Sequence, residues 1–178
     1  MPGDTSALPC MQADMTGELE GQKVAKRRYF TVEVANRMLP LVRSIVQDFV
    51  EELKQYDALA ERMTVLSAVE KQRLTASHRE EVEEVERRWQ ACGARLRELL
   101  HELDNLGVEL KGSNGLVDFP ALLHGREIYL CWQLGEPEVM YWHEKDAGFK
   151  GRQRITERLR AELAAEEPES LGDVSGAS

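Results

Sequence analysis

The sequence predicts an α+β fold in which a long antiparallel helical hairpin packs with a small antiparallel β-sheet. Three observations support this prediction. Apolar residues recur at helical spacing through the first half of the chain, and in the last third they alternate at strand spacing. Gly107 separates the two patterns, as expected of a residue that ends a helix. The 178 residues suffice for one domain with a buried core.

The first helix is predicted to begin after Thr31, because its hydroxyl can accept a hydrogen bond from a first-turn amide. Glu33 then lies favourably at the positive helix end. Pro40 removes one amide hydrogen bond and predicts a kink in the first turns. The apolar stripe that follows is broad enough to face a core. It consists of Met38, Leu39, Val42, Ile45, Val46, Phe49, Val50, Leu53 and Tyr56.

The second helix carries a stripe with strict spacing of three and four residues, which is typical of a coiled-coil seam. Its members are Val82, Val85, Trp89, Cys92, Leu96, Leu99, Leu103 and Leu106. The helix is expected to start at Ser67 or Ser77, because a glutamate follows each of them three residues later in a capping-box pattern. Gly107 is expected to end it as a left-handed cap, with Val108 folding back. A linker over residues 61–76 would let the two helices run antiparallel.

Strand patterns follow the helices. Residues 108–111 are expected to form a short strand, and residues 112–115 (Gly-Ser-Asn-Gly) have strong turn chemistry. Residues 128–134 and 139–144 alternate between two faces around a turn at 135–137, so they predict a β-hairpin. Four residues of this hairpin are expected to be structural: Trp132, Trp142, Gly135 and Pro137.

The chain is expected to be divided into a disordered N-terminal tail (1–28), a single α+β domain (29–155), and a C-terminal segment (156–178). The last segment is predicted to hold a short helix over 156–165 and a disordered acidic tail. The net charge of -9 argues against a nucleic-acid partner. The sequence contains no apolar run long enough to cross a bilayer and no secretion signal, and three scattered cysteines suit a reducing cytoplasm.

Three strings within residues 29–155 carry a resemblance to a known family: FTVEVANRMLPLV, GVELKGSNGLVDFPALLHGREIYLCWQLGEPEV and YWHEKDAGFKGRQ. On these strings the sequence resembles a bacterial family of unknown function, DUF2203. The resemblance implies the same helical start, a compact sheet and a small bacterial cytoplasmic protein, and it implies no established activity. Val34 departs from the family, whose members tend to have Glu there, so the reciprocal capping box is lost at the first helix.

A metal site is one hypothesis for the C-terminal third, because imidazole, thiolate and carboxylate together suit zinc or iron. The candidate ligands are Asp118, Cys131, Glu136 and His143, with Glu144 and Asp146 as further acids. Zinc ligands usually include a pair that is close in sequence, and no such pair is present. The leading alternative is structural, with Cys131 as a small core residue and His143 as a hydrogen-bonded one.

The length of the turn decides whether Cys131 and His143 lie on the same face of the predicted hairpin. A two-residue turn places them on opposite faces, and a three-residue turn places them on the same one. Arg126 and Arg152 could hold an anionic ligand. The favoured alternative is a structural network in which such charges tie an Asp118 loop and the loop over residues 148–151 to the sheet.

Two further acids, Glu98 and Glu52, lie in the predicted helices. Glu98 and His101 match the Glu-x-x-His motif of di-iron bundles. At 100° per residue they lie well over 100° from the centre of the seam, so they are predicted to face away from it. Glu52 falls near the first apolar stripe and is interpreted as an edge residue in preference to a buried acid.

The sequence therefore leaves two hypotheses for function. The first is a helical interaction module that forms a homo-oligomer through its long helices, because a two-helix hairpin leaves part of the first stripe uncovered. The sheet would then supply a polar recognition surface. The second is a metal-assisted or acid-base enzyme that uses Asp118, Cys131, Glu136 and His143. Neither hypothesis identifies a substrate or a reaction.

Overall fold

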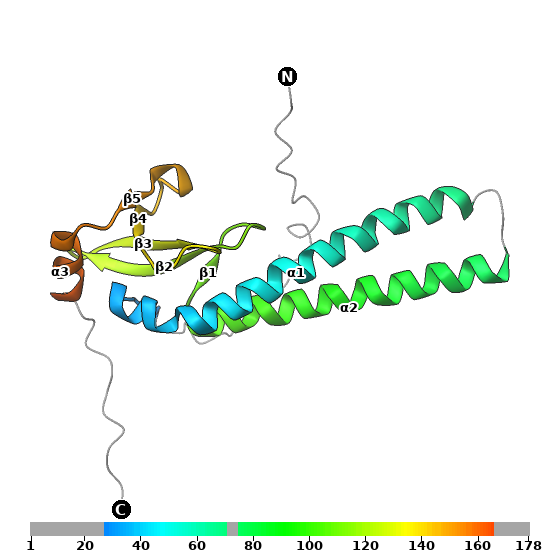
Figure 1. Cartoon of the computed structure of the whole chain (residues 1–178), viewed down its shortest axis with the longest axis horizontal. Helices are drawn as coiled ribbons and strands as arrows, with labels where there is room; N and C mark the ends of the chain where they lie inside the picture. The colour runs from blue at the N-terminus through cyan, green and yellow to red at the C-terminus, as the bar shows by residue number, and fades with distance from the viewer. Residues whose placement is uncertain (1–26, 71–74, 166–178) are drawn as a thin grey trace, which may run out of the picture.

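The computed structural model describes residues 27–70 and 75–165 (Figure 1). Helices α1 (Val32–Glu70) and α2 (Ala76–Leu106) form a long antiparallel hairpin, and a five-stranded antiparallel sheet and helix α3 (Glu157–Ala165) lie against one end of it. The predicted α+β class and helical hairpin are confirmed. The disorder predicted before residue 27 and after residue 165 falls outside the described residues.

The sheet is a meander in which every strand pairs with its neighbours in sequence, in the order β1-β2-β3-β4-β5. The strands are β1 (Glu109–Leu110), β2 (Leu116–Leu123), β3 (Arg126–Gln133), β4 (Tyr141–Glu144) and β5 (Gln153–Arg154). The β3–β4 pair is the predicted hairpin. Strands β2 and β5 were not predicted from the sequence.

Helix α1 begins as predicted and ends later than predicted. The Thr31 hydroxyl accepts a hydrogen bond from the amide of Val34 (3.3 Å), and the helix continues through Pro40. It then runs to Glu70, so the linker predicted over residues 61–76 is wrong for most of its length. Two polar residues of this stretch fit into the helix because their hydroxyls bond back to carbonyls four residues earlier: Thr64 to Ala60 and Ser67 to Met63.

Helix α2 starts at a residue that the sequence analysis did not consider. Its N-cap is Thr75, whose hydroxyl accepts a hydrogen bond from the amide of His78 (3.3 Å), so neither Ser67 nor Ser77 caps it. At the other end Gly107 adopts the predicted left-handed conformation with φ +79°. The Val108 amide then donates to the Leu103 carbonyl (3.0 Å), which confirms the fold-back after the cap.

Strand β2 corrects the expectation of a loop around Asp118. Residues 116–123 pair along their whole length with β3, and Asp118 lies opposite Cys131. The strand was not predicted because it contains a proline, which has no N–H group to donate a hydrogen bond to a neighbouring strand. Pro120 is accommodated because β1 ends before it, and its carbonyl accepts a hydrogen bond from the Phe30 amide (2.8 Å).

The main core lies between one face of the sheet and the nearby halves of the two long helices. That face contributes Val117, Phe119, Ala121, Leu123, Ile128, Leu130 and Trp132, all buried. They pack with α1 residues from Val32 to Phe49 and with Leu96, Leu99 and Leu103 of α2. Farther along the hairpin, where it extends beyond the sheet, Leu59, Val85 and Cys92 form a smaller cluster (Figure 1).

The C-terminal part closes the sheet edge. A 3₁₀ turn, η1 (Phe149–Gly151), precedes β5, and α3 begins where the Thr156 hydroxyl accepts a hydrogen bond from the Leu159 amide (3.3 Å). Leu163 of α3 is buried in the main core. None of the helices within the described ranges has a stretch long and apolar enough to span a bilayer.

Candidate metal centre

The face of the sheet that points away from the helical hairpin carries three of the four predicted metal ligands. Asp118 of β2 is the register partner of Cys131 of β3, and Cys131 is the partner of Tyr141 of β4. His143 lies two residues beyond Tyr141, so it shares their face. The register therefore resolves the question left open by the turn length: Cys131 and His143 lie on the same side of the hairpin.

The three side chains lie close together and are shielded from solvent. Asp118, Cys131 and His143 expose 2%, 0% and 3% of their surface. One candidate ligand atom from each lies within 4.8 Å of the others, and no other such group of three or more occurs within residues 27–70 and 75–165. The His143 Nε2 atom is 3.2 Å from Asp118 Oδ2.

Hydrogen-bond geometry fixes where the His143 ring carries a proton. Its Nδ1 atom is 2.8 Å from the Glu144 carbonyl oxygen, which can only accept, so Nδ1 is the donor. A neutral ring then has a bare Nε2, and that atom faces a carboxylate oxygen that also only accepts when ionised. The Asp118–His143 contact therefore requires a proton between the two atoms or a cation in its place.

The other oxygen of Asp118 has no strong hydrogen-bond donor beside it. Asp118 Oδ1 is buried and has no conventional hydrogen-bond partner in the described part of the chain, and the Cys131 thiol that interacts with this carboxylate is only a weak donor. Leaving such an atom unpaired costs about 1–3 kcal/mol. One oxygen of the Asp118 carboxylate, one nitrogen of the His143 ring and the Cys131 sulfur lie within 4.8 Å of one another, and this donor set suits zinc or iron.

Cys131 cannot act as a free thiolate nucleophile in this surrounding. Burial and the Asp118 carboxylate together raise the pKa of its thiol to about 12, although Arg152 opposes both effects. The thiol therefore keeps its proton at neutral pH unless a metal ion displaces it.

Aromatic side chains cover the group on two sides. Tyr129 stacks on the His143 ring with a centroid separation of 5.5 Å, and the Tyr129 hydroxyl accepts a hydrogen bond from Arg27 (2.7 Å). On the other side Arg152 lies over the Tyr141 ring, 4.3 Å from its centroid. The strand alternation could have placed both tyrosines on the Cys131 face. No local pattern could have identified Arg27, which lies 102 positions from Tyr129.

The remaining acids of the metal hypothesis lie outside the group. Glu136 accepts two hydrogen bonds from Arg152 (2.7 and 2.9 Å) and one from the Gln133 amide (2.9 Å). Glu144 is exposed and adjacent to His143 on the strand, so its side chain points to the opposite face. Asp146 is exposed in the turn that follows β4.

The residues suggested for anion binding are separated. Arg126 is exposed at the start of β3, whereas Arg152 contacts the Cys131 carbonyl near the end of that strand (3.4 Å). Arg152 is instead paired with Glu136, as in the structural network of the sequence analysis. Trp132 is fully buried and donates to the Glu136 carbonyl (3.0 Å), and Trp142 packs partly against the core.

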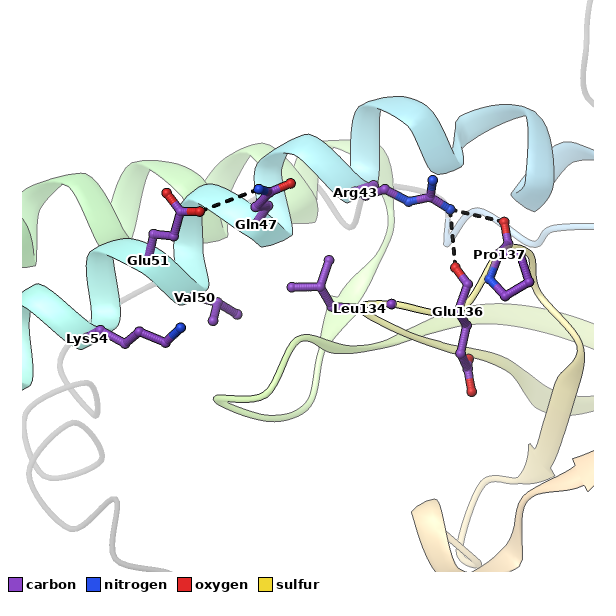
Figure 2. A pocket seen from close by; sticks show the side chains of 9 residues that line it. Arg43, Gln47, Val50, Glu51, Lys54, Leu134, Glu136 and Pro137 are labelled. Atoms are coloured by element: carbon purple, nitrogen blue, oxygen red, sulfur yellow. Dashed lines mark hydrogen bonds between the residues drawn. The ribbon is translucent and has the colours of Figure 1, made fainter.

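The turn residues Gly135 and Pro137 line an open cleft of about 460 Å³ between α1 and the β3–β4 turn (Figure 2). Arg43 of α1 donates to the carbonyls of Glu136 (3.2 Å) and Pro137 (3.0 Å). The Glu136 carboxylate points away from α1 (Figure 2), toward Arg152. Glu136 thus contacts Arg43 of the cleft through its carbonyl and Arg152 through its carboxylate, and Arg152 in turn contacts the Cys131 carbonyl.

The charged helix residues take no part in the buried group. Glu98 pairs with Arg95 (3.2 Å) and His101 contacts Asn105 (3.0 Å), and all four side chains are on exposed or partly exposed helix surface. Glu52 is half-buried at the edge of the hairpin. Burial raises the pKa of the Cys92 thiol, and the nearby Glu52 carboxylate raises it further.

Fold and site together define an α+β protein in which an antiparallel meander holds a buried Asp–Cys–His group and packs on a helical hairpin. A family model described as "Uncharacterized conserved protein (DUF2203)" matches residues 28–155, and the chain belongs to this family. The match spans the described fold from the residues before α1 to the residue after β5. Searches of curated proteins and of solved structures found no match.

Proposed function

We propose that this protein binds a divalent, thiophilic metal ion, such as zinc or ferrous iron, through Asp118, Cys131 and His143. The observation that carries the proposal is the convergence of the three candidate ligand atoms within 4.8 Å at buried positions. Buried polar groups are normally bonded, and Asp118 Oδ1 is one of several buried atoms in the described residues without a hydrogen-bond partner, which a bound ion would supply.

The chemistry of the donor set supports a divalent ion. With the ion bound, the Asp118 carboxylate and the Cys131 thiolate would supply two negative charges that balance the metal charge in a site of low dielectric constant. The His143 ring is already held for coordination through Nε2, because its Nδ1 donates to a backbone carbonyl (2.8 Å). This second contact is the usual one for metal-binding histidines, where it fixes the tautomer and the ring orientation.

The burial of all three side chains favours a closed centre over one that admits a large substrate. A bound ion would link β2, β3 and β4 and stabilise the folded sheet. Metal-assisted chemistry on a small molecule is the enzymatic form of the same proposal, since three protein ligands leave one position of a tetrahedral ion for water.

Metal analysis of purified protein after incubation with zinc and removal of excess ion tests the proposal. We expect about one ion per chain. Cys131→Ala and His143→Ala should lose it, whereas Cys92→Ala is a matched control because Cys92 is the other buried, free cysteine in the described residues. A wild-type protein without bound ion, or a Cys131→Ala variant that retains it, would contradict the proposal.

A second candidate function concerns the part of the hairpin beyond the sheet. Its cluster of Leu59, Val85 and Cys92 is small, and partly exposed apolar residues surround it: Tyr56, Met63, Leu66 and Trp89. Val65 exposes 63% of its surface nearby. We propose that this end pairs with a second copy of the chain to form a four-helix arrangement, which would cover these residues.

Light scattering across a range of protein concentrations tests the dimer. We expect Val65→Glu to shift the equilibrium toward the monomer. Leu41→Glu is the matched control, because Leu41 is also an exposed apolar residue of α1 (52%) but lies beside the sheet. A wild-type protein that stays monomeric at high concentration would rule out the proposed pairing.

A further inference from the structure

The Arg152 guanidinium is held beside Cys131 by contacts to four groups: the Glu136 carboxylate, the Cys131 carbonyl and two aromatic rings. Its Nη2 atom donates to both carboxylate oxygens of Glu136 and lies 3.4 Å from the Cys131 carbonyl oxygen. The guanidinium carbon lies 4.3 Å from the centroid of Tyr141, the register partner of Cys131, and 5.1 Å from that of Phe149. Only 12% of the side chain is exposed.

One donor of this fixed guanidinium is unused. Arg152 Nε is buried and has no hydrogen-bond partner within the described ranges. A buried N–H without an acceptor costs about 1–3 kcal/mol, so its position requires an explanation. The neutral thiol of Cys131 is a weak acceptor, whereas a metal-bound thiolate is a strong one.

We infer that Arg152 donates a hydrogen bond from Nε to the metal-bound thiolate of Cys131, and that Glu136 holds Arg152 in the position to do so. This inference rests on the proposed metal site and assigns it a residue outside the ligand set. Arg152 is thus a positioning residue. Glu136, which the sequence suggested as a metal ligand, instead contacts Arg152 and would not touch the ion.

The contacts around Glu136 agree with this role. The Glu136 carboxylate is itself fixed by the Gln133 amide (2.9 Å), so the chain of contacts from the β3–β4 turn to Cys131 is continuous. Hydrogen bonds to ligating atoms commonly change metal affinity by 10–100-fold.

Cobalt(II) is the probe, because a cobalt–thiolate bond gives a near-ultraviolet charge-transfer band whose energy reports on the sulfur. In Arg152→Met we expect the band to move to lower energy and the cobalt affinity to fall about 10–100-fold, since the thiolate loses a donor. Glu136→Gln should cause smaller changes in the same direction. Arg154→Met is the matched control, because Arg154 is an exposed arginine of β5 two residues away.

The outcomes separate the two proposals. If wild-type protein takes up no cobalt, the metal site fails and the role of Arg152 fails with it. If wild-type protein binds cobalt and Arg152→Met has the same band and affinity, only the role of Arg152 is wrong. Arg152→Lys keeps the charge but not the planar donor array. If Arg152→Met does not fold, as judged by circular dichroism, a wild-type band in both Arg152→Lys and Glu136→Gln would overturn the inference.

Discussion

At the scale of single residues, the proton on the Cys131 thiol must leave before a metal ion can bind to the sulfur, because a pKa of about 12 keeps the thiol protonated at neutral pH. The Nδ1 atom of His143 already donates to the Glu144 carbonyl, so its Nε2 atom, 3.2 Å from Asp118 Oδ2, is the ring nitrogen that an ion would bind.

Zinc binding at pH 7 should therefore release at least about one proton per ion, from the Cys131 thiol. The release can be measured with an indicator dye in weakly buffered solution. Because the raised pKa of Cys131 lies far above neutral pH, affinity should increase as pH rises from 6 to 8, by about one log unit per pH unit for each proton displaced. Zinc affinity that is independent of pH would show that the thiol is not a ligand.

The sequence identifies the residue types of the candidate centre but not its composition. Cys131 and His143 stand out as rare ligand types within two alternating strands. Their position beside Asp118 depends on the register of β4 with β3, which the turn after β3 sets. It also depends on β2, which was not predicted because it contains Pro120. Glu136 was indistinguishable from a ligand, because its pairing with Arg152 joins two positions 16 residues apart.

At the scale of elements, the β1–β2 turn is locked between α1 and the β3–β4 turn. A Cβ atom at Gly115 would lie 2.8 Å from the Leu134 Cβ atom and 2.9 Å from the Val46 Cγ1 atom, and φ at Gly115 is +76°. The Leu134 amide also donates to the Gly115 carbonyl (3.0 Å). This one residue therefore sets how closely the sheet approaches the hairpin.

Gly115→Ala should lower the free energy of unfolding by about 2–4 kcal/mol, from left-handed strain plus overpacking. Gly125→Ala measures the cost of left-handed strain alone, because φ is +72° there and no atom lies within 4 Å of the added Cβ. It should cost about 1–2 kcal/mol. Urea denaturation measures both, and equal losses would show that the close contacts at Gly115 relax without cost.

Element boundaries were predictable where one residue type has one physical role. Gly107 ends α2 because it adopts φ +79°, and Thr31 caps α1 through its hydroxyl. The far end of α1 was not predictable, because its serine and threonine are typical of loops and are tolerated only through hydrogen bonds to the preceding turn.

At the scale of the whole molecule, the core and the candidate centre occupy opposite faces of the same sheet. Trp132 points into the main core, and Cys131, its neighbour in β3, points into the buried polar group. An ion that joins three strands would therefore stabilise the surface against which both helices pack. The second apolar cluster, farther along the hairpin, has no part in this coupling.

Zinc at about 100 times its dissociation constant should stabilise the protein by about 2.7 kcal/mol. For a chain of this size, this corresponds to a rise in melting temperature of about 5–10 °C. Differential scanning fluorimetry with and without zinc measures the shift. Cys92→Ala should keep the shift and Cys131→Ala should lose it, and a wild-type melting temperature that zinc leaves unchanged would argue against a specific site.

The meander places all three candidate ligands on consecutive strands, and the outermost two, Asp118 and His143, are only 25 positions apart in the chain. Closing loops of this size costs little chain entropy, since each doubling of length adds only about 0.6 kcal/mol. An ion would therefore cross-link β2, β3 and β4 at a small cost in chain entropy, and its binding free energy would add to the stability of the sheet.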